Sequence, residues 1–403
     1  MVSMKEWETI QLYHACKLVA GYAFKSKDFG DYPDKVIKIT HIVPPTVDMK
    51  NLTGVDLSQY ERKKLIKYIA KQGDYVLAMT GATIGKMGRI EESEAYVNQR
   101  VLLFKNNSNV DKDYLFYVLQ QNKFQQYILN HIDSESAQPN ISAATVGKYE
   151  FLLPSLKIQN KIGKFLRLID DKINVNNRIN DNLEQQAAAI FRSWFVNCIP
   201  FGGIAPDEWK NVTLEDITAM VSRGITPKYA DDTDQIIINQ KCIRNHMIDL
   251  SLARNHRPKV INDKWLRFGD LLINSTGDGT LGRAAPVWFQ PHNLTVDSHV
   301  TIVRPATENL IFYIGLWGTQ HEKEIESLHT GSTGQTELPR DRVKAMKLVL
   351  PDSKTLAHFN SVMAPMASAI VTNLEENQRL ANLRDALLPK LMSGEIDVSS
   401  IKI

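Results

Sequence analysis

The stretch TGATIGKMGR (residues 80–89) has the glycines and the lysine of a phosphate-binding loop. A nucleotide P-loop has the pattern G-x-x-x-x-G-K-[ST], in which backbone N–H groups hold phosphates and the hydroxyl binds Mg²⁺. Here only three residues separate Gly81 from Gly85, and Met87 stands where Ser or Thr is required. Two interpretations remain. The stretch is a turn in which glycine permits positive φ, or a loop whose N–H groups and Lys86 meet DNA phosphates.

Other catalytic patterns give no set of reacting residues. The sequence has no N-P-P-[FYW] methyltransferase motif, no G-x-G-x-x-G and no H-E-x-x-H, and its ten histidines show no metal-ligand spacing. One PD…ExK nuclease-like match exists, at Pro33, Asp34, Glu61 and Lys63, but these residue types are common and the match occurs once. We therefore expect a non-catalytic chain that binds no metal and no cofactor of its own.

Bulk properties are those of an ordinary globular protein. The 403 residues suffice for two or three domains, and the net charge of +3 neither demands nor excludes a basic face. The three cysteines, Cys16, Cys198 and Cys242, lie far apart, which argues against a disulfide framework and fits a reducing compartment. No apolar run reaches 18 residues. We expect a cytoplasmic protein that makes no contact with a membrane.

The chain contains an internal repeat. Gly73-Asp74 recurs 196 residues later as Gly269-Asp270, and Thr80-Gly81 recurs at the same distance as Thr276-Gly277. The segment YVLAM, which follows Gly73-Asp74, and the segment DLLIN, which begins at Asp270, are apolar enough to be buried strands. The sequence therefore predicts two copies of one globular domain, each followed by a helical tail.

Both tails have apolar residues spaced alternately by four and three, the pattern of a coiled-coil seam. The seam of the second tail repeats the first at a distance of 197 residues, including two asparagines. The first seam consists of Ile162, Leu166, Ile169, Ile173, Asn176, Asn180, Leu183, Ala187, Ile190 and Trp194. The second consists of Phe359, Met363, Met366, Ile370, Asn373, Asn377, Leu380, Arg384, Leu387 and Leu391.

The second globular domain follows the first helix, so the second helix must run back to pair with the first. Symmetric overlap places Asn176 opposite Asn377 and Asn180 opposite Asn373, a polar layer that can fix register. Two separate helices, each packed on its own domain, are the alternative. In either case Pro365, inside the second helix, is expected to kink or restart its first turns.

The predicted fold class is α+β, with two similar α/β domains joined by a long antiparallel two-helix coiled coil in a pseudo-two-fold arrangement. The predicted boundaries are 1–155 for the first globular domain, 156–198 for the central helix, 199–351 for the second globular domain and 352–403 for the distal helix.

The globular domains carry residue types that read base edges and hold phosphates, and several occur at matching places of the two copies. An ordinary solvated loop is the alternative for each residue taken alone. The candidate DNA contacts are Thr80, Lys86, Arg89, Gln99, Arg100, Gln138 and Asn140 in the first copy and Thr276, Arg283, Ser298, His299, Ser332 and Gln335 in the second.

The whole chain resembles the specificity subunits of type I restriction–modification enzymes. The resemblance rests on the two-copy plan and on residues 153–196 and 350–396, which are similar to the family's central and distal conserved regions; the ending LLPKLMSGEI is especially typical.

The resemblance implies two target-recognition domains, each of which reads half of a bipartite double-stranded DNA site. It also implies that the helices act as a spacer that fixes the gap between the half-sites and as the docking site for two methyltransferase (modification) subunits. Motor-restriction subunits would complete the enzyme, and S-adenosylmethionine and ATP would bind those partners. The helical residues assigned to the spacer and partner interface are Ile169, Ile173, Asn176, Asn180, Leu183, Phe191, Ile370, Asn373, Asn377, Leu380 and Leu387. Apolar residues outside the seam, Phe165, Leu168, Phe191, Phe195, Leu374 and Leu388, are expected to be exposed unless they pack on the chain's own domains.

Three rival functions remain open at this stage. A self-contained nuclease or fused restriction–methylation enzyme would need motifs that the sequence lacks. A scaffold between two protein partners would show no sequence-dependent DNA protection. An antitoxin-like specificity subunit that acts only with methyltransferases cannot be distinguished by sequence from a subunit of a full restriction–modification enzyme.

Overall fold

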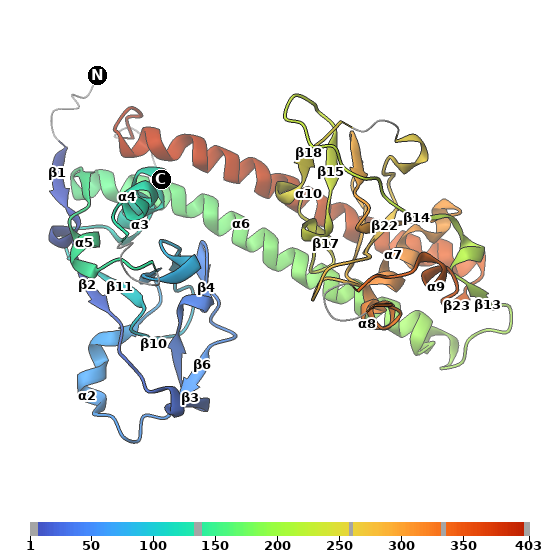
Figure 1. Cartoon of the computed structure of the whole chain (residues 1–403), viewed down its shortest axis with the longest axis horizontal. Coiled ribbons are helices and arrows are strands. Elements are labelled where there is room, and N and C mark those ends of the chain that lie inside the picture. The colour runs from blue at the N-terminus through green and yellow to red at the C-terminus, as the bar shows by residue number, and fades with distance from the viewer. Residues whose placement is uncertain (1–6, 133–138, 258–260, 332–335, 399–403) are drawn as a thin grey trace. The chain divides into compact units, whose positions relative to one another are not determined.

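The computed structural model describes residues 7–132, 139–257, 261–331 and 336–398. These residues form two compact units (Figure 1). Unit 1 comprises Met1–Ile173 together with Gln378–Ile403, and unit 2 comprises Asn174–Asn377. Each unit therefore contains one globular part and a segment from each of the two long helices.

Unit 1 is built on two sheets. The six-stranded sheet has the order β2-β11-β8-β9-β5-β4, and the four-stranded sheet has the order β6-β3-β10-β7. The strands of the first are β2 (Cys16–Ala20), β11 (Val101–Asn106), β8 (Tyr75–Ala78), β9 (Met87–Arg89), β5 (Thr46–Val47) and β4 (Ile42–Val43). Those of the second are β6 (Thr53–Val55), β3 (Phe29–Ile37), β10 (Ala95–Val97) and β7 (Ile69–Ala70). A separate antiparallel pair joins β1 (Glu8–Gln11) to β12 (Glu150–Leu153).

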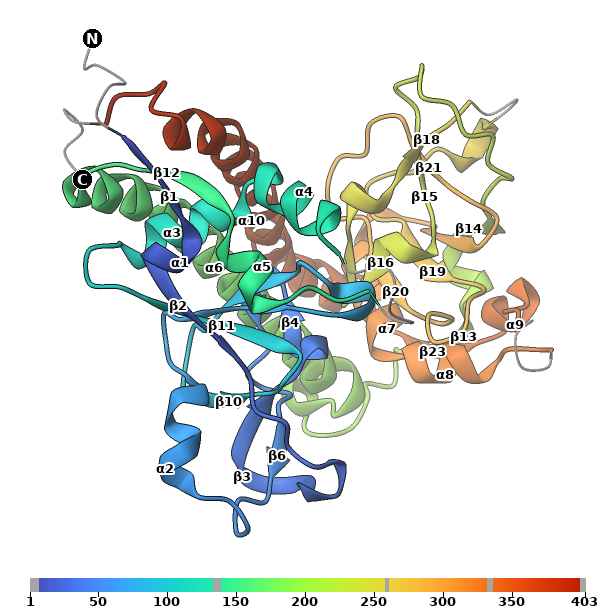
Figure 2. The ribbon, with the colours of Figure 1, turned by 60° about the vertical axis from the view of Figure 1, so that its left-hand side comes forward.

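The central strands of the six-stranded sheet, β8, β9 and most of β11, are buried on both faces, whereas β2 and β4 have exposed residues. Side chains alternate between faces along a strand. In β8, Tyr75 and Leu77 belong to a core that includes helical residues, whereas Val76 and Ala78 belong to a second core on the opposite face. Figure 2 shows helices beside this sheet and β3 and β6 beyond it. The helices of the globular part are α1 (Leu12–Ala15), α2 (Arg62–Leu65), α3 (Lys112–Gln120), α4 (Asn122–Asn130) and α5 (Ala143–Gly147).

Unit 2 repeats this topology, which confirms the predicted internal repeat. The order β14-β22-β19-β20 matches β2-β11-β8-β9, the parallel pair β15–β21 matches β3–β10, and the pair β13–β23 matches β1–β12. Its strands are β13 (Lys210–Thr213), β14 (Thr218–Arg223), β15 (Ile236–Ile238), β16 (Ile243–Arg244), β17 (Met247–Ile248), β18 (Arg254–Asn255), β19 (Leu271–Asn274), β20 (Ala284–Pro286), β21 (Leu294–Val296), β22 (Val300–Pro305) and β23 (Lys347–Leu350). Its short helices are α7 (Ile311–Gln320), α8 (Glu322–Ser327) and α9 (Arg340–Lys344).

The repeated Gly-Asp pair has a structural role in both units. Gly73 and Gly269 adopt positive φ of +82° and +93°, and the following carboxylates are buried. Asp270 accepts two hydrogen bonds from Arg304, at 2.7 and 2.8 Å, while Asp74 pairs with Lys105 and Lys112. A buried carboxylate requires such partners, because an unpaired charge away from water is costly.

Two long helices, α6 (Leu156–Phe191) and α10 (Ser353–Met392), contribute to both units. Within unit 2, Asn176 donates to Asn377 Oδ1 at 2.9 Å, and Asn373 donates to Asn180 Oδ1 at 2.8 Å. The partner number falls on α10 as it rises on α6, so the helices run antiparallel there. Both the direction and the predicted asparagine pairing are confirmed.

Within unit 1 the same two helices are joined by charge. Arg384 of α10 donates to Asp170 of α6 at 2.8 Å, and the Tyr117 hydroxyl of α3 donates to the same carboxylate at 2.5 Å. Ile162 and Leu166 of α6 belong to the core that contains the globular residues of this unit. Their helical period thus places one apolar face of α6 against the globular part of unit 1.

The structure decides three points about the helices that the sequence left open. Helix α10 runs unbroken through Pro365, whose ring is exposed, so this proline neither ends nor restarts the helix. Phe191 is 1% exposed, because it packs on Tyr313 and Phe359 within unit 2. Leu388 is buried in the core of unit 1. These two apolar side chains pack on the chain's own domains and present no surface to a partner.

Candidate DNA-recognition surface

Three segments of unit 1 that are far apart in sequence meet at the end of β8. The Met79 backbone N–H donates to the Arg100 carbonyl at 2.9 Å, and the Gly81 N–H donates to the Pro139 carbonyl at 3.0 Å. Thr80 and Asn140 form an isolated antiparallel bridge. The predicted candidates around residues 80, 100 and 140 therefore lie together at one edge of the fold.

Unit 2 brings the matching segments together at the end of β19. The Ser275 N–H donates to the His299 carbonyl at 2.8 Å, and the Leu338 N–H donates to the Ser275 carbonyl at 2.8 Å. Thr276 Oγ1 lies 2.7 Å from His299 Nδ1. Burial raises the pKa of the Asp297 carboxyl, which accepts a hydrogen bond from the His299 N–H at 2.9 Å. The recurrence shows that one backbone arrangement presents both sets of candidates.

The glycine-rich stretch is a turn between two antiparallel strands. It connects β8 to β9 in unit 1, and Gly81 and Gly85 adopt φ of +72° and +82°. In unit 2 the loop connects β19 to β20, and Gly277 and Gly282 adopt φ of +102° and +84°. The turn interpretation is confirmed, and a phosphate-facing role for the loop stays a prediction.

The candidates differ in their access to solvent. Lys86, Gln99, Arg100 and His299 are exposed, and Asn140, Thr276, Arg283 and Ser298 are partly buried. The Arg283 guanidinium donates to the Gly279 carbonyl of its own loop at 2.8 Å, which holds the side chain against that loop. Gln138, Ser332 and Gln335 lie outside the described residues.

Two candidates in unit 1 are buried, which corrects their assignment as DNA contacts. Thr80 is 3% exposed, and its hydroxyl donates to the Pro139 carbonyl at 3.0 Å. Arg89 is also 3% exposed, because its guanidinium pairs with Asp113 at 2.6 Å and lies 4.2 Å from the centroid of the Phe116 ring. Neither side chain can reach DNA while these contacts hold.

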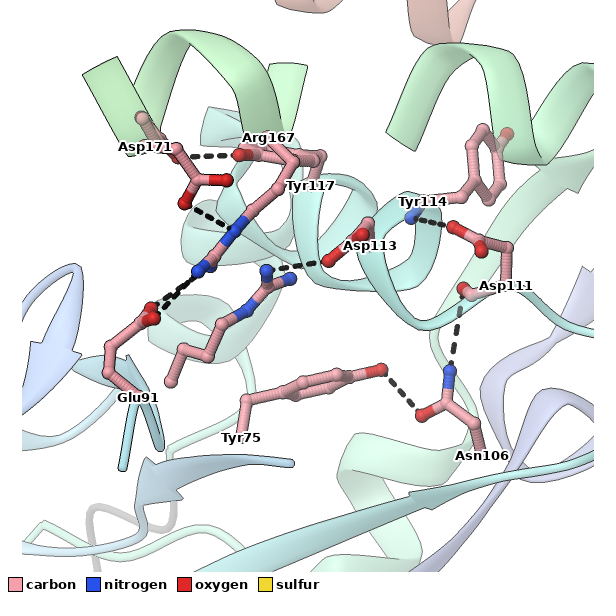
Figure 3. Close-up of polar contacts among 11 residues, drawn as sticks. Tyr75, Glu91, Asn106, Asp111, Asp113, Tyr114, Tyr117, Arg167 and Asp171 are labelled. Carbon is pink, nitrogen blue, oxygen red and sulfur yellow. Dashed lines mark hydrogen bonds and ion pairs between the residues drawn. The ribbon is translucent and has the colours of Figure 1, made fainter. Parts of the chain in front are cut away.

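A polar network beside Arg89 joins the globular part of unit 1 to α6 (Figure 3). Arg167 of α6 donates twice to Glu91, at 2.9 and 2.6 Å, and pairs with Asp171 at 2.8 Å. Such bidentate contacts fix geometry better than a single point charge does. The network therefore ties α6 to Glu91, which follows β9.

Sequence reasoning missed two residues beside the unit 2 loop. Arg223 pairs with Glu337 and donates to the Leu338 carbonyl at 2.9 Å, which positions the third segment. The Gln240 carbonyl accepts a hydrogen bond from the Asn274 side chain at 3.0 Å, and its own side chain lies beside Gly277. Gln240 precedes the loop by more than thirty residues, so no local pattern indicated it.

The nuclease-like match has no catalytic arrangement. Asp34 pairs with Arg62 at 2.9 Å, and Glu61 pairs with Lys64 at 2.8 Å. Across the described ranges no group of three or more His, Cys, Asp or Glu side chains has metal-binding geometry. A search of the same residues finds no helix with the length and apolar character needed to cross a membrane.

Comparison with known proteins agrees with this architecture. Residues 4–185 match the family model described as the type I restriction modification DNA specificity domain. The chain is 24% identical to the MjaIX specificity subunit of Methanocaldococcus jannaschii, over 98% of this chain and 95% of that protein. It is 23% identical to the HindI specificity subunit of Haemophilus influenzae, over 74% and 81% of the respective chains.

Among solved structures, the type I restriction–modification S subunit from M. genitalium shares the fold. It superposes with a TM-score of 0.58 at 12% identity, over 99% of both chains. Residues 4–185 thus match the type I restriction modification DNA specificity domain, and the chain along nearly its whole length is similar to type I restriction enzyme specificity subunits.

Proposed function

We propose that this chain is the DNA sequence-recognition subunit of a type I restriction–modification complex, in which each unit reads one half of a bipartite target. The observation that carries this proposal is the recurrence of one loop arrangement, at the ends of β8 and β19, in two units of the same topology. Exposed Lys86, Arg100 and His299 give these edges donors for phosphates and bases.

The long helices supply the second part of the function. In unit 2 the apolar side chains of Val175, Ile179 and Leu374 are 48%, 43% and 37% exposed, and Leu168 and Leu383 are exposed in unit 1. Exposed apolar residues on a helix pair favour a protein partner. Two modification subunits are the partners that we assign to these helices, with motor-restriction subunits completing the nuclease.

The chain itself is assigned no catalytic step. S-adenosylmethionine and ATP are assigned to the modification and motor subunits. Because DNA rises about 3.4 Å per base pair, helices of fixed length would set a fixed gap between half-sites. Insertion of one helical turn into both α6 and α10 should lengthen the gap and leave both half-sites unchanged. A change of half-site sequence with an unchanged gap would exclude a spacer role.

Sequence-dependent DNA binding by the complex assembled with its modification subunits tests the recognition role. Substituting Lys86→Ala or Arg100→Ala should weaken binding, because each removes an exposed cation from the unit 1 edge. Lys50→Ala, an exposed lysine in the loop between β5 and β6, is the matched control and should have a smaller effect. Equal protection of all DNA sequences by the complex would point to a scaffold instead.

A further inference from the structure

An arginine of unit 2 stacks on an aromatic ring at the surface, beside the sheet formed by β18, β15 and β21 (Figure 2). The guanidinium carbon of Arg254, in β18, lies 3.5 Å from the centroid of the Tyr229 ring. Tyr229 is 44% exposed, and Arg254 is exposed as well. The two side chains therefore form a planar stack that is open to solvent and to a ligand.

The backbone pairing explains why these two side chains meet. Tyr229 forms an isolated antiparallel bridge with His256, and Arg254 lies two residues before His256. Alternate residues of a strand point to the same face, and diagonal neighbours on two strands are within reach of aromatic and long side chains. The Arg257 N–H donates to the Lys228 carbonyl at 2.8 Å, which continues the pairing beyond the bridge. The position of the stack is thus fixed by the main chain.

The guanidinium of Arg254 keeps its donors available. Within the described ranges Arg254 has no ion pair, and its side chain makes no hydrogen bond. Two acids of the adjoining loop have other partners: Asp232 pairs with Arg257, and Asp234 accepts a hydrogen bond from an asparagine side chain at 2.6 Å. The third acid, Asp231, is exposed. Because a guanidinium donates from the edge of its plane, a ring against one face orients the plane and leaves the N–H groups open.

The stack is continuous with the candidate recognition edge at the end of β19. The Ile225 N–H donates to the Val296 carbonyl at 3.0 Å. Ile225 also forms a parallel bridge with Asp297, whose carboxylate accepts the His299 N–H at 2.9 Å. Tyr229 follows Ile225 by four residues, which span at most about 14 Å of extended chain. This length corresponds to about four base-pair steps of about 3.4 Å, so the stack and His299 can face the same half-site.

We propose that Arg254 binds a guanine in the half-site of unit 2, and that Tyr229 is the positioning residue that orients its guanidinium. Two N–H donors of an arginine match the O6 and N7 acceptors of guanine, which is the commonest specific contact in the major groove. An arginine already oriented on a ring loses less side-chain freedom when it binds. This inference rests on the proposed function and deepens it, since it names one base and the side chain that recognises it.

Arg254→Ala tests the contact. Sites methylated by the assembled complex would be mapped by long-read sequencing for the parent and the variant. The variant should accept other base pairs at one G·C position, with discrimination lowered about tenfold or more, in the half-site that changes when residues 199–351 are exchanged. The other half-site and the gap should stay unchanged. Arg257→Ala is the matched control, because Arg257 lies three residues further on but is held by Asp232, and it should keep the parent specificity.

Two results of this mapping would overturn the proposal. One is an unchanged specificity of Arg254→Ala. The other is a weakening that is uniform across DNA sequences and reduces the salt dependence of binding, because that pattern marks a phosphate contact.

A base analogue gives a readout on the parent protein, which does not depend on the folding of a variant. Each guanine of the half-site would be replaced in turn by 7-deazaguanine, which lacks the N7 acceptor, and binding of the assembled complex would be measured. One position should lose about fivefold or more in affinity. The same replacement should cost the Arg254→Ala complex nothing further. Equal losses in parent and variant, or a half-site with no sensitive guanine, would overturn the assignment.

The role of the ring is tested by two substitutions of Tyr229. Tyr229→Phe keeps the ring and should keep the parent specificity. Tyr229→Leu removes the ring and should relax the same G·C position as Arg254→Ala, by a smaller factor. Equal loss at every position of the half-site would mean that the ring only stabilises the unit, and would overturn its positioning role.

The inference and the proposed function fail in different ways. A parent complex that protects all DNA sequences equally would overturn the proposed function itself. A parent complex that recognises its site, together with a site unchanged by Arg254→Ala, would overturn the assignment of Arg254 alone.

Discussion

Units 1 and 2 have the same strand order but stabilise it with different side chains. In unit 2 the buried carboxylate after Gly269 meets Arg304, which is also buried, whereas in unit 1 Asp74 meets two lysines that are partly or largely exposed. Between the long helices it is unit 1 that has the partly buried ion pair, Asp170–Arg384, whereas unit 2 has asparagine pairs and alanines. The repeat preserves the backbone, while charge and volume at matching positions have diverged.

The largest expected effect concerns the Gly-Asp carboxylates. Asp270→Ala leaves the buried Arg304 without a counter-ion and should destabilise unit 2 by about 3–5 kcal/mol. Asp74→Ala should cost unit 1 less, because Lys105 and Lys112 can turn toward water. Hydrogen exchange measured for each unit by mass spectrometry would compare the two. A larger loss in unit 1 would contradict the account of their burial.

A smaller effect is expected where unit 1 joins its helices by charge. Arg384→Leu removes the ion partner of Asp170, while Asp170 still accepts the hydrogen bond from the Tyr117 hydroxyl. The substitution should lower the stability of unit 1 by about 1–3 kcal/mol. Lys390→Leu, at an exposed position of the same helix, is the control and should change stability by less than about 0.5 kcal/mol. Hydrogen exchange of the unit 1 amides would measure both losses of stability. Equal losses in the two variants would mean that the Asp170–Arg384 pair does not stabilise unit 1.

The start of α10 in unit 2 provides a third comparison. Asp352 accepts the backbone N–H groups of Lys354 and Thr355 at 2.9 and 3.0 Å, and the Thr355 side chain is the main reason that its pKa falls to about 2. Asp352→Ala should cost about 1 kcal/mol at neutral pH.

Because the folded pKa lies below the ordinary value of 3.8, this contribution is present above about pH 4 and is lost as pH falls toward 2. Urea unfolding followed by tryptophan fluorescence would measure it, since five of the six tryptophans lie in unit 2. A difference between variant and parent that persisted undiminished at pH 2 would rule out the capping carboxylate as its source.

The smallest effect is expected at Glu184, a partly buried acid on the unit 2 segment of α6. The folded pKa of Glu184, about 7, lies above its ordinary value of 4.5, so the folded chain holds this proton more tightly than the unfolded chain. Stability should therefore fall as pH rises from about 4.5 to 7, and Glu184→Gln should remove that part of the decline. The melting temperature of the variant should exceed that of the parent at pH 8 and match it at pH 4.5. An equal difference at both pH values would exclude Glu184 as the titrating group.

The helices and the repeat could be predicted because their signals are local and periodic. The four–three spacing predicted the two helices, the position of the second globular domain between them predicted their antiparallel direction, and symmetric overlap of the seams predicted the pairs Asn176–Asn377 and Asn180–Asn373. Burial could not be predicted in the same way. Arg89 lies in a loop-rich stretch that looks solvated, and its partner Asp113 is on a helix that follows two further strands.

The correspondence between helix positions of the two units was also beyond sequence reasoning, for a geometric reason. Ala187 and Ala188 of α6 in unit 2 correspond to Arg384 and Asp385 of α10 in unit 1. That correspondence has meaning only once the helices are known to pack antiparallel against the globular parts. The exposed candidates Lys86, Gln99 and Arg100 followed from residue type and repeat position, and their contacts with DNA stay a prediction.

The most direct test of the proposal that each unit recognises one half-site is a domain exchange. Residues 199–351 would be replaced by the corresponding segment of another specificity subunit, and methylated sites would be mapped by long-read sequencing in cells that produce the assembled complex. One half of the bipartite site should change, while the other half and the gap stay the same. Alteration of both halves, or of neither, would contradict the assignment of one half-site to each unit.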